Sequence, residues 1–98
     1  MYSLIINTYK RREYIMYGIN KINTKDIQVG NYAYSDYTEQ WYIVSVLPNF
    51  IEEGFDIYAL IRLDGQGYYY KSDSLNELKK KISQDGGETI IYKDLIVE

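Results

Sequence analysis

The side chains that could do chemistry in this sequence are mainly carboxylates and phenols. The chain contains no His and no Cys, so the commonest general base, the usual thiol nucleophile and the usual zinc ligands are missing. Glu52 and Glu53 with Asp56 form one group of carboxylates, and paired carboxylates can act as an acid and a base. Adjacent Glu residues in a loop are more typical of a solvated surface, and no other pattern supports catalysis. The sequence therefore predicts a protein without a catalytic site, a metal site or a cofactor.

A long segment of the chain is acidic and aromatic and carries no positive charge. Between Lys25 and Arg62 there is neither Lys nor Arg. A surface of this kind attracts basic partners and repels phosphates, and Tyr and Trp are enriched where binding energy concentrates. We expect one exposed patch that binds a cationic surface; the alternative is that the carboxylates only keep loops and sheet edges soluble. The predicted partner-binding residues are Asp36, Tyr37, Glu39, Glu52, Glu53 and Asp56, with Tyr34 and Tyr42 as anchors.

The overall charge points to the same class of partner. The 98 residues carry a formal net charge of −3, which argues against direct binding of nucleic acid. A basic, nucleic-acid-handling protein is the predicted partner, bound where that protein holds phosphates. The AT-rich character of the composition suggests a phage or mobile element, with anti-CRISPR or anti-restriction activity. The lack of Cys fits a cytoplasmic protein, and no apolar run is long enough to cross a membrane.

A second hypothesis rests on three consecutive tyrosines. In a regular strand Tyr68 and Tyr70 share one face, and with Arg62 and Lys71 they could stack and neutralise a nucleotide or nucleic acid. The plainer interpretation of these rings is that they fill the core and pack across strands. A third possibility is a homo-oligomer, in which exposed tyrosines pair between copies.

Alternating apolar residues predict most of the fold. Strands are expected over residues 25–34, 40–47, 55–63, 68–71 and 89–97, and Asp64-Gly65 marks a hairpin. Ser74 followed by Glu77 is a capping box, which predicts a helix over residues 74–83. The fold class is α+β, a curved antiparallel sheet of four to six strands with one helix near the C-terminus. The predicted core is Ile27, Val29, Trp41, Ile43, Val44, Val46, Ile57, Ala59, Ile61, Leu75, Leu78, Ile82, Ile90 and Ile91.

The segment VGNYAYSD…QWYIVSV resembles the opening hairpin of small SH3-like or Tudor-like barrels. The resemblance implies that the sheet closes into an SH3-like barrel. The helix before the last strand departs from the simplest barrels of this type.

The chain is expected to form a single domain over residues 1–98. Residues 10–13 read Lys-Arg-Arg-Glu, which can be encoded by a purine-rich ribosome-binding sequence placed before Met16. One hypothesis is therefore that residues 1–15 are a non-native leader and that the core domain is 16–98. The alternative is that residues 3–8 form a genuine edge strand followed by a basic turn.

Overall fold

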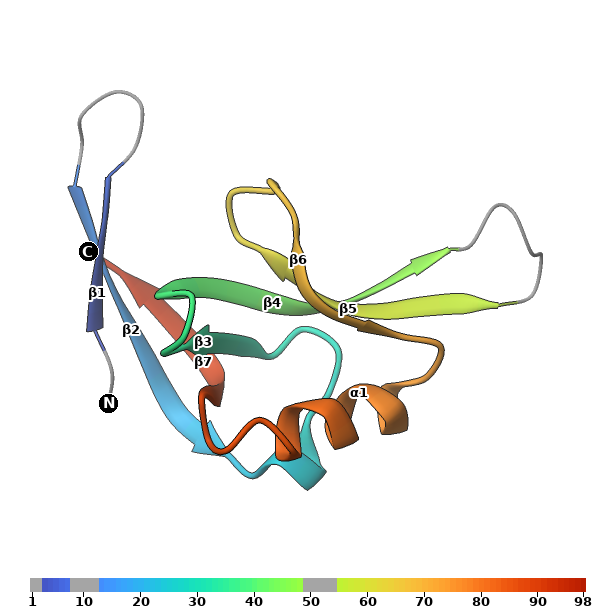
Figure 1. The fold of residues 1–98 in the computed structure, drawn as a ribbon. Coiled ribbons are helices and arrows are strands. Elements are labelled where there is room, and N and C mark those ends of the chain that lie inside the picture. Colours follow the sequence, from blue (N-terminus) through green and yellow to red (C-terminus); the bar gives the residue numbers. More distant parts are fainter. Residues whose placement is uncertain (1–2, 8–12, 49–54) are drawn as a thin grey trace.

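The computed structural model describes residues 3–7, 13–48 and 55–98, with side chains from residue 15 onward. These residues form seven strands and one α-helix (Figure 1). The elements in chain order are β1 (Ser3–Asn7), β2 (Glu13–Ile22), the 3-10 turn η1 (Thr24–Asp26), β3 (Tyr32–Ser35), β4 (Gln40–Pro48), β5 (Asp56–Arg62), β6 (Tyr68–Ser72), α1 (Leu75–Ser83) and β7 (Thr89–Val97).

The strands form one antiparallel sheet in the order β1-β2-β7-β3-β4-β5-β6. The α+β class, the curved antiparallel sheet and the single helix near the C-terminus are thus confirmed. The sheet has seven strands where four to six were expected, because β1 and β2 extend it beyond β7. It stays open, with β1 and β6 at its two edges, so the predicted SH3-like barrel is not formed.

Strand β2 has an irregular residue that interrupts its pairing with β7. Asn20, near the C-terminal end of β2, has φ 60°, a left-handed conformation that Asn tolerates better than most residues. Its side-chain amide donates a hydrogen bond of 2.9 Å to the Asp94 carboxylate on β7, so both strands are held at the bend. In Figure 1, β2 runs at a steep angle to β3 and β4.

Helix α1 lies across one face of the sheet and is fastened on both flanks. The Ser74 hydroxyl accepts a hydrogen bond from the Glu77 amide at 3.1 Å, as the capping box predicted. The Lys79 ammonium donates to the carbonyl oxygen of Lys25 on η1, and the Lys81 ammonium donates to that of Lys71 on β6. Leu78 and Ile82 face the sheet and are fully buried.

The two faces of the sheet carry separate clusters of buried side chains. The cluster beneath α1 consists of Ile27, Ala33, Tyr42, Val44, Leu60, Leu78, Ile82 and Ile91. On the opposite face Trp41 packs against Tyr34 and Tyr92, with ring centroids 5.1 and 5.7 Å away, and Met16 from β2 completes the cluster. The centre of the sheet is therefore buried on both sides.

Most of the predicted core residues are buried or half-buried, and two are not. Val29 is 45% exposed and Val46 is 40% exposed. Val29 lies in the loop between η1 and β3, because the strand predicted over residues 25–34 begins only at Tyr32. Val46 lies near the outer end of the β4–β5 hairpin, which extends past the helix (Figure 1).

Candidate functional site

The predicted acidic and aromatic patch is divided in two. Asp36, Tyr37 and Glu39 lie on the turn before β4, whereas Asp56 pairs with Pro48 at the far end of that strand. Nine residues of extended chain separate these ends by about 25 Å, at ~3.3 Å per residue. Glu52 and Glu53 lie outside the described residues. The first and last of the predicted acidic residues therefore do not share one surface.

The two predicted anchors are not on the surface. Tyr34 is 1% exposed and Tyr42 is 2% exposed, so neither ring can contact a partner, and this part of the prediction is wrong. Tyr34 packs on Trp41, and the Tyr42 hydroxyl lies 2.8 Å from the Thr38 hydroxyl. A buried phenol needs a partner for its hydroxyl, and the fold supplies one to Tyr42 inside the protein.

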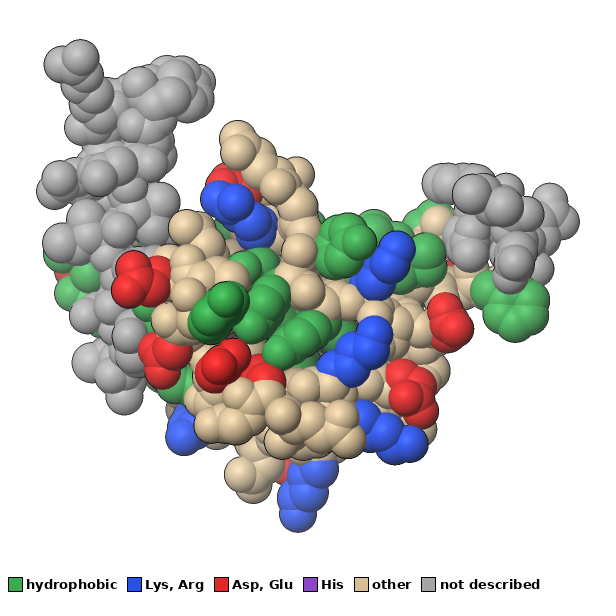
Figure 2. Space-filling model, in the orientation of Figure 1, with side chains coloured by type: hydrophobic (Ala, Val, Ile, Leu, Met, Phe, Trp, Pro, Cys, Tyr) green, Lys and Arg blue, Asp and Glu red, His purple; other side chains and the backbone are tan. Residues whose placement is uncertain are grey.

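The loop between α1 and β7 brings two further carboxylates beside the β3–β4 turn. The Asp36 amide donates a hydrogen bond of 2.8 Å to the Glu88 carbonyl oxygen, and Ser35 pairs with Thr89 at the start of β7. We call Asp36, Tyr37, Glu39, Asp85 and Glu88 the acidic corner. Figure 2 shows acidic side chains gathered around a hydrophobic patch on this side of the molecule. Asp85 and Glu88 were missed from the sequence, because their position depends on which strand β7 joins.

The turn itself projects a tyrosine between two carboxylates. Tyr37 is 74% exposed, and Asp36 and Glu39 are exposed as well. The amide of Glu39 donates to the Ser35 carbonyl oxygen at 2.8 Å, which closes the turn and places Glu39 at φ 55°. A left-handed conformation is unfavourable for Glu, which has a Cβ atom and no side-chain amide.

The carboxylates of the corner differ in how they are used. Asp85 accepts hydrogen bonds from the amides of Gly87 and Glu88, both at 3.1 Å, and from the Thr89 hydroxyl at 2.5 Å. It therefore holds the loop in shape. In the described part of the chain, Asp36 and Glu39 have no side-chain hydrogen bond and no ion pair. Their charges are free to interact with a partner.

Two stacked tyrosines support the corner from β6. The Tyr69 hydroxyl donates to the Glu88 carboxylate at 3.4 Å, and the Tyr70 hydroxyl donates to Asp85 at 3.3 Å. Burial raises the pKa of the Tyr70 phenol well above its ordinary value, and a hydrogen bond with Tyr69 and the negative charge of Asp85 raise it further. Tyr70 is therefore a neutral hydrogen-bond donor at physiological pH.

A β-bulge separates the residues of the alternative nucleotide site. Ala59 pairs with Lys71 and Ile61 pairs with Tyr68, so Tyr69 and Tyr70 together stand opposite Leu60. Both rings turn to the helix side and stack with centroids 4.3 Å apart. Tyr68 lies on the other face, with the Lys71 ammonium 5.3 Å from its ring centre. Tyr68 and Tyr70 thus do not share a face, contrary to the expected alternation.

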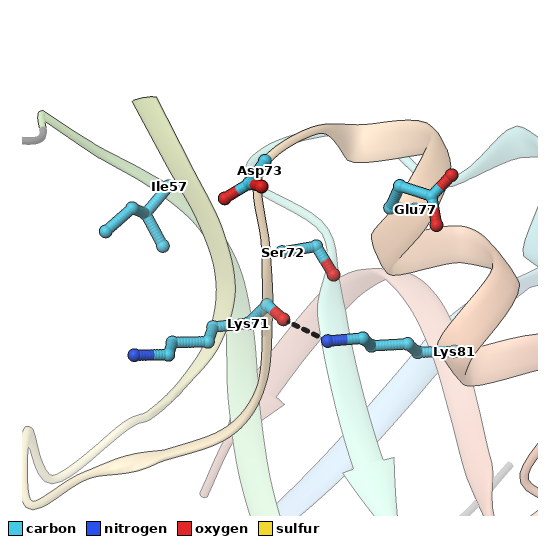
Figure 3. Close-up of a pocket in the computed structure, with 6 residues that line it drawn as sticks. All are labelled: Ile57, Lys71, Ser72, Asp73, Glu77 and Lys81. Atoms are coloured by element: carbon cyan, nitrogen blue, oxygen red, sulfur yellow. Dashed lines mark hydrogen bonds between the residues drawn. The ribbon is translucent and has the colours of Figure 1, made fainter. Parts of the chain in front are cut away.

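The remaining members of that alternative site are also engaged elsewhere. The Arg62 guanidinium forms an ion pair of 2.6 Å with Asp64 in the β5–β6 turn. Figure 3 shows the hollow beside Lys71, where the Lys81 side chain points to the Lys71 carbonyl oxygen and the Lys71 side chain points away. Asp73 and Glu77 line the same hollow, so its two positive charges are balanced. This arrangement does not favour a phosphate.

Within residues 3–7, 13–48 and 55–98, no group of three or more acidic residues is placed to hold a metal ion. In the same ranges, no helix has the length and apolar character needed to cross a membrane. Comparison with known proteins finds no matching family model, no similar curated protein and no similar solved structure.

Proposed function

We propose that the protein is a non-enzymatic binding protein that uses the acidic corner to contact a cationic surface of another protein. The observation that carries this proposal is the exposed Tyr37 flanked in the turn by Asp36 and Glu39, whose carboxylates have no hydrogen bond or ion pair among the described residues. Charged groups that are free of internal partners steer a partner of opposite sign, and an exposed aromatic ring supplies contact area at its centre.

The class of partner follows from the chemistry of the corner. Carboxylates pair best with Arg and Lys, and proteins that handle nucleic acids concentrate these residues where they hold phosphates. Asp36 and Glu39 would occupy phosphate positions in such a groove, with Glu88 beside them. An inhibitor of a restriction or CRISPR nuclease, acting in the cytoplasm of a bacterial host, is the function that this interpretation favours.

Competition with DNA tests the proposal directly. A fluorescent duplex is bound to a panel of purified restriction and CRISPR nucleases, and its release is followed by anisotropy as the protein is added. Release is expected with at least one nuclease and should fall about tenfold or more for Asp36→Lys/Glu39→Lys, because close charge pairs are worth more than 1.4 kcal/mol in such interfaces.

The matched control is Asp56→Lys/Asp73→Lys, which makes the same change in net charge at two exposed residues away from the corner. If both double variants lose the same amount of DNA release, only the net charge matters, and the acidic corner has no specific role. Absence of release across the panel would count against this class of partner.

A further inference from the structure

A groove on the η1 side of α1 has the opposite charge to the acidic corner. Its volume is about 630 Å³, and its cationic residues are Lys25, Lys79 and Lys80. The Glu77 carboxylate also lines it, but the Lys80 ammonium bonds that carboxylate at 3.2 Å, so three positive charges face one negative charge. We call this hollow the lysine groove. The rest of its lining is polar and includes Thr24, Ser74 and Asn76.

The β3–β4 turn has the charge that such a groove would attract. Tyr37 is 74% exposed and is flanked by the exposed carboxylates of Asp36 and Glu39. The groove is several times larger than a phenol ring, which leaves room for the ring and for part of the turn. We call Asp36, Tyr37 and Glu39 the tyrosine knob.

We propose that the tyrosine knob of one copy of this protein docks in the lysine groove of a second copy. The Tyr37 ring would lie along the Lys79 and Lys80 side chains, where the ring face attracts an ammonium group. Asp36 and Glu39 would meet the ammonium groups at the groove's rim, so that charges of opposite sign are brought together.

Because the knob and the groove are different surfaces, the contact is head-to-tail. Each copy that joins leaves one knob and one groove free, so copies assemble into a ring or an open chain. The contact is small, and an interface of this size is weak and transient. Self-association is therefore expected at high protein concentration and low salt, where charges are screened least.

This inference shares the tyrosine knob with the proposed function and adds regulation to it. A copy whose knob is docked cannot present it to a foreign partner, so self-association and partner binding would compete. Docking of a second copy in the lysine groove does not require that the acidic corner also binds a foreign partner.

Sedimentation velocity of the full chain measures the association. The weight-average mass should rise between about 10 µM and 1 mM protein in 20 mM NaCl. The apparent dissociation constant should be about tenfold higher in 300 mM NaCl, because salt screens the charges. Two variants separate the surfaces: Tyr37→Ala/Glu39→Gln removes the knob, and Lys25→Glu/Lys80→Glu reverses the groove. Each should be monomeric alone, whereas a mixture should form a heterodimer that stops at two copies.

The controls make the same kinds of change elsewhere. Tyr68→Ala removes another exposed ring, and Lys71→Glu/Lys93→Glu reverses two exposed lysines outside the groove; both should still associate. A monomeric wild-type protein at 1 mM, or a mixture that stays monomeric, would overturn the inference. If the wild type is monomeric but still releases DNA from a nuclease, self-docking fails and the proposed function stands.

Discussion

The Asp36 amide and the Glu88 carbonyl oxygen are joined by a hydrogen bond of 2.8 Å, although the two residues are far apart in the sequence. This bond fastens the β3–β4 turn to the loop that follows α1. Four acidic side chains, two from each of these segments, belong to the acidic corner as a result, together with the exposed ring of Tyr37. The acidic corner exists only when β7 has paired with β3.

Asp85 is expected to be the most important acidic residue of the corner for stability. Asp85→Ala would leave the Gly87 and Glu88 amides and the Thr89 hydroxyl without their acceptor. The free energy of unfolding should fall by about 1–3 kcal/mol, as measured by urea denaturation. Asp36→Ala, which removes an exposed carboxylate of the same corner, is the control and should change stability by less than about 0.5 kcal/mol. Equal effects would show that Asp85 does not hold the loop.

Glu39 is expected to lower the stability of the fold and to contribute to partner binding. Its φ of 55° suits Gly better than any residue with a Cβ atom. Glu39→Gly should therefore raise the free energy of unfolding by up to about 1 kcal/mol, and Glu39→Val should lower it. The same Gly variant should release less DNA in the competition assay. A Val variant as stable as the Gly variant would contradict the strain assigned to this turn.

Tyr70 is expected to weaken the fold at alkaline pH. Its pKa is raised in the folded protein, so above about pH 10 the unfolded chain loses this proton first and binds fewer protons than the folded chain. The free energy of unfolding must then fall as pH rises, by at most about 1.4 kcal/mol per pH unit from this group. Below about pH 10 the phenol is protonated in both the folded and the unfolded chain, so the contribution of Tyr70 to the free energy of unfolding is fully present.

The comparison uses Tyr70→Phe, which removes the titrating phenol. Urea denaturation at pH 9 and pH 11 should show a smaller loss of stability for Tyr70→Phe than for the wild type. Tyr37→Phe removes an exposed phenol and serves as the control. If Tyr70→Phe and the wild type lose the same free energy over this interval, the phenol is not held in its neutral form by burial beside Tyr69 and Asp85.

Gly18 is expected to tolerate no side chain. A Cβ atom at this position would overlap the ring of Tyr92, which covers the glycine from the neighbouring strand. Gly18→Ala should cost about 1–3 kcal/mol in thermal or urea unfolding, as over-packing usually does. In the double variant Gly18→Ala/Tyr92→Ala the ring is gone, and the cost of Gly18→Ala should be much smaller. If Gly18→Ala lowers stability by the same amount when the Tyr92 ring is absent, overlap with this ring is not the cause.

Local patterns predicted the elements that depend on neighbouring residues. The helix follows from the Ser74 cap and the spacing of Leu78 and Ile82, and the β5 strand follows from its alternation. The patterns did not predict the burial of Tyr34 and Tyr42, because both faces of this sheet are covered, one by α1 and the other by the bent end of β2 and β7. Alternation alone does not show whether a polar-tipped ring faces solvent.

The sequence by itself determined the class of chemistry: a chain without His or Cys, with an uninterrupted acidic and tyrosine-rich segment, can offer carboxylates and phenols to a cationic partner. Only the tertiary structure decided which of them share a surface. The length of β4 separates Asp36 from Asp56, the bulge in β6 turns Tyr69 and Tyr70 to the same side, and the pairing of β7 with β3 adds Asp85 and Glu88. Strand order and register are long-range properties, set by the burial of both faces at once and not by any short run of residues.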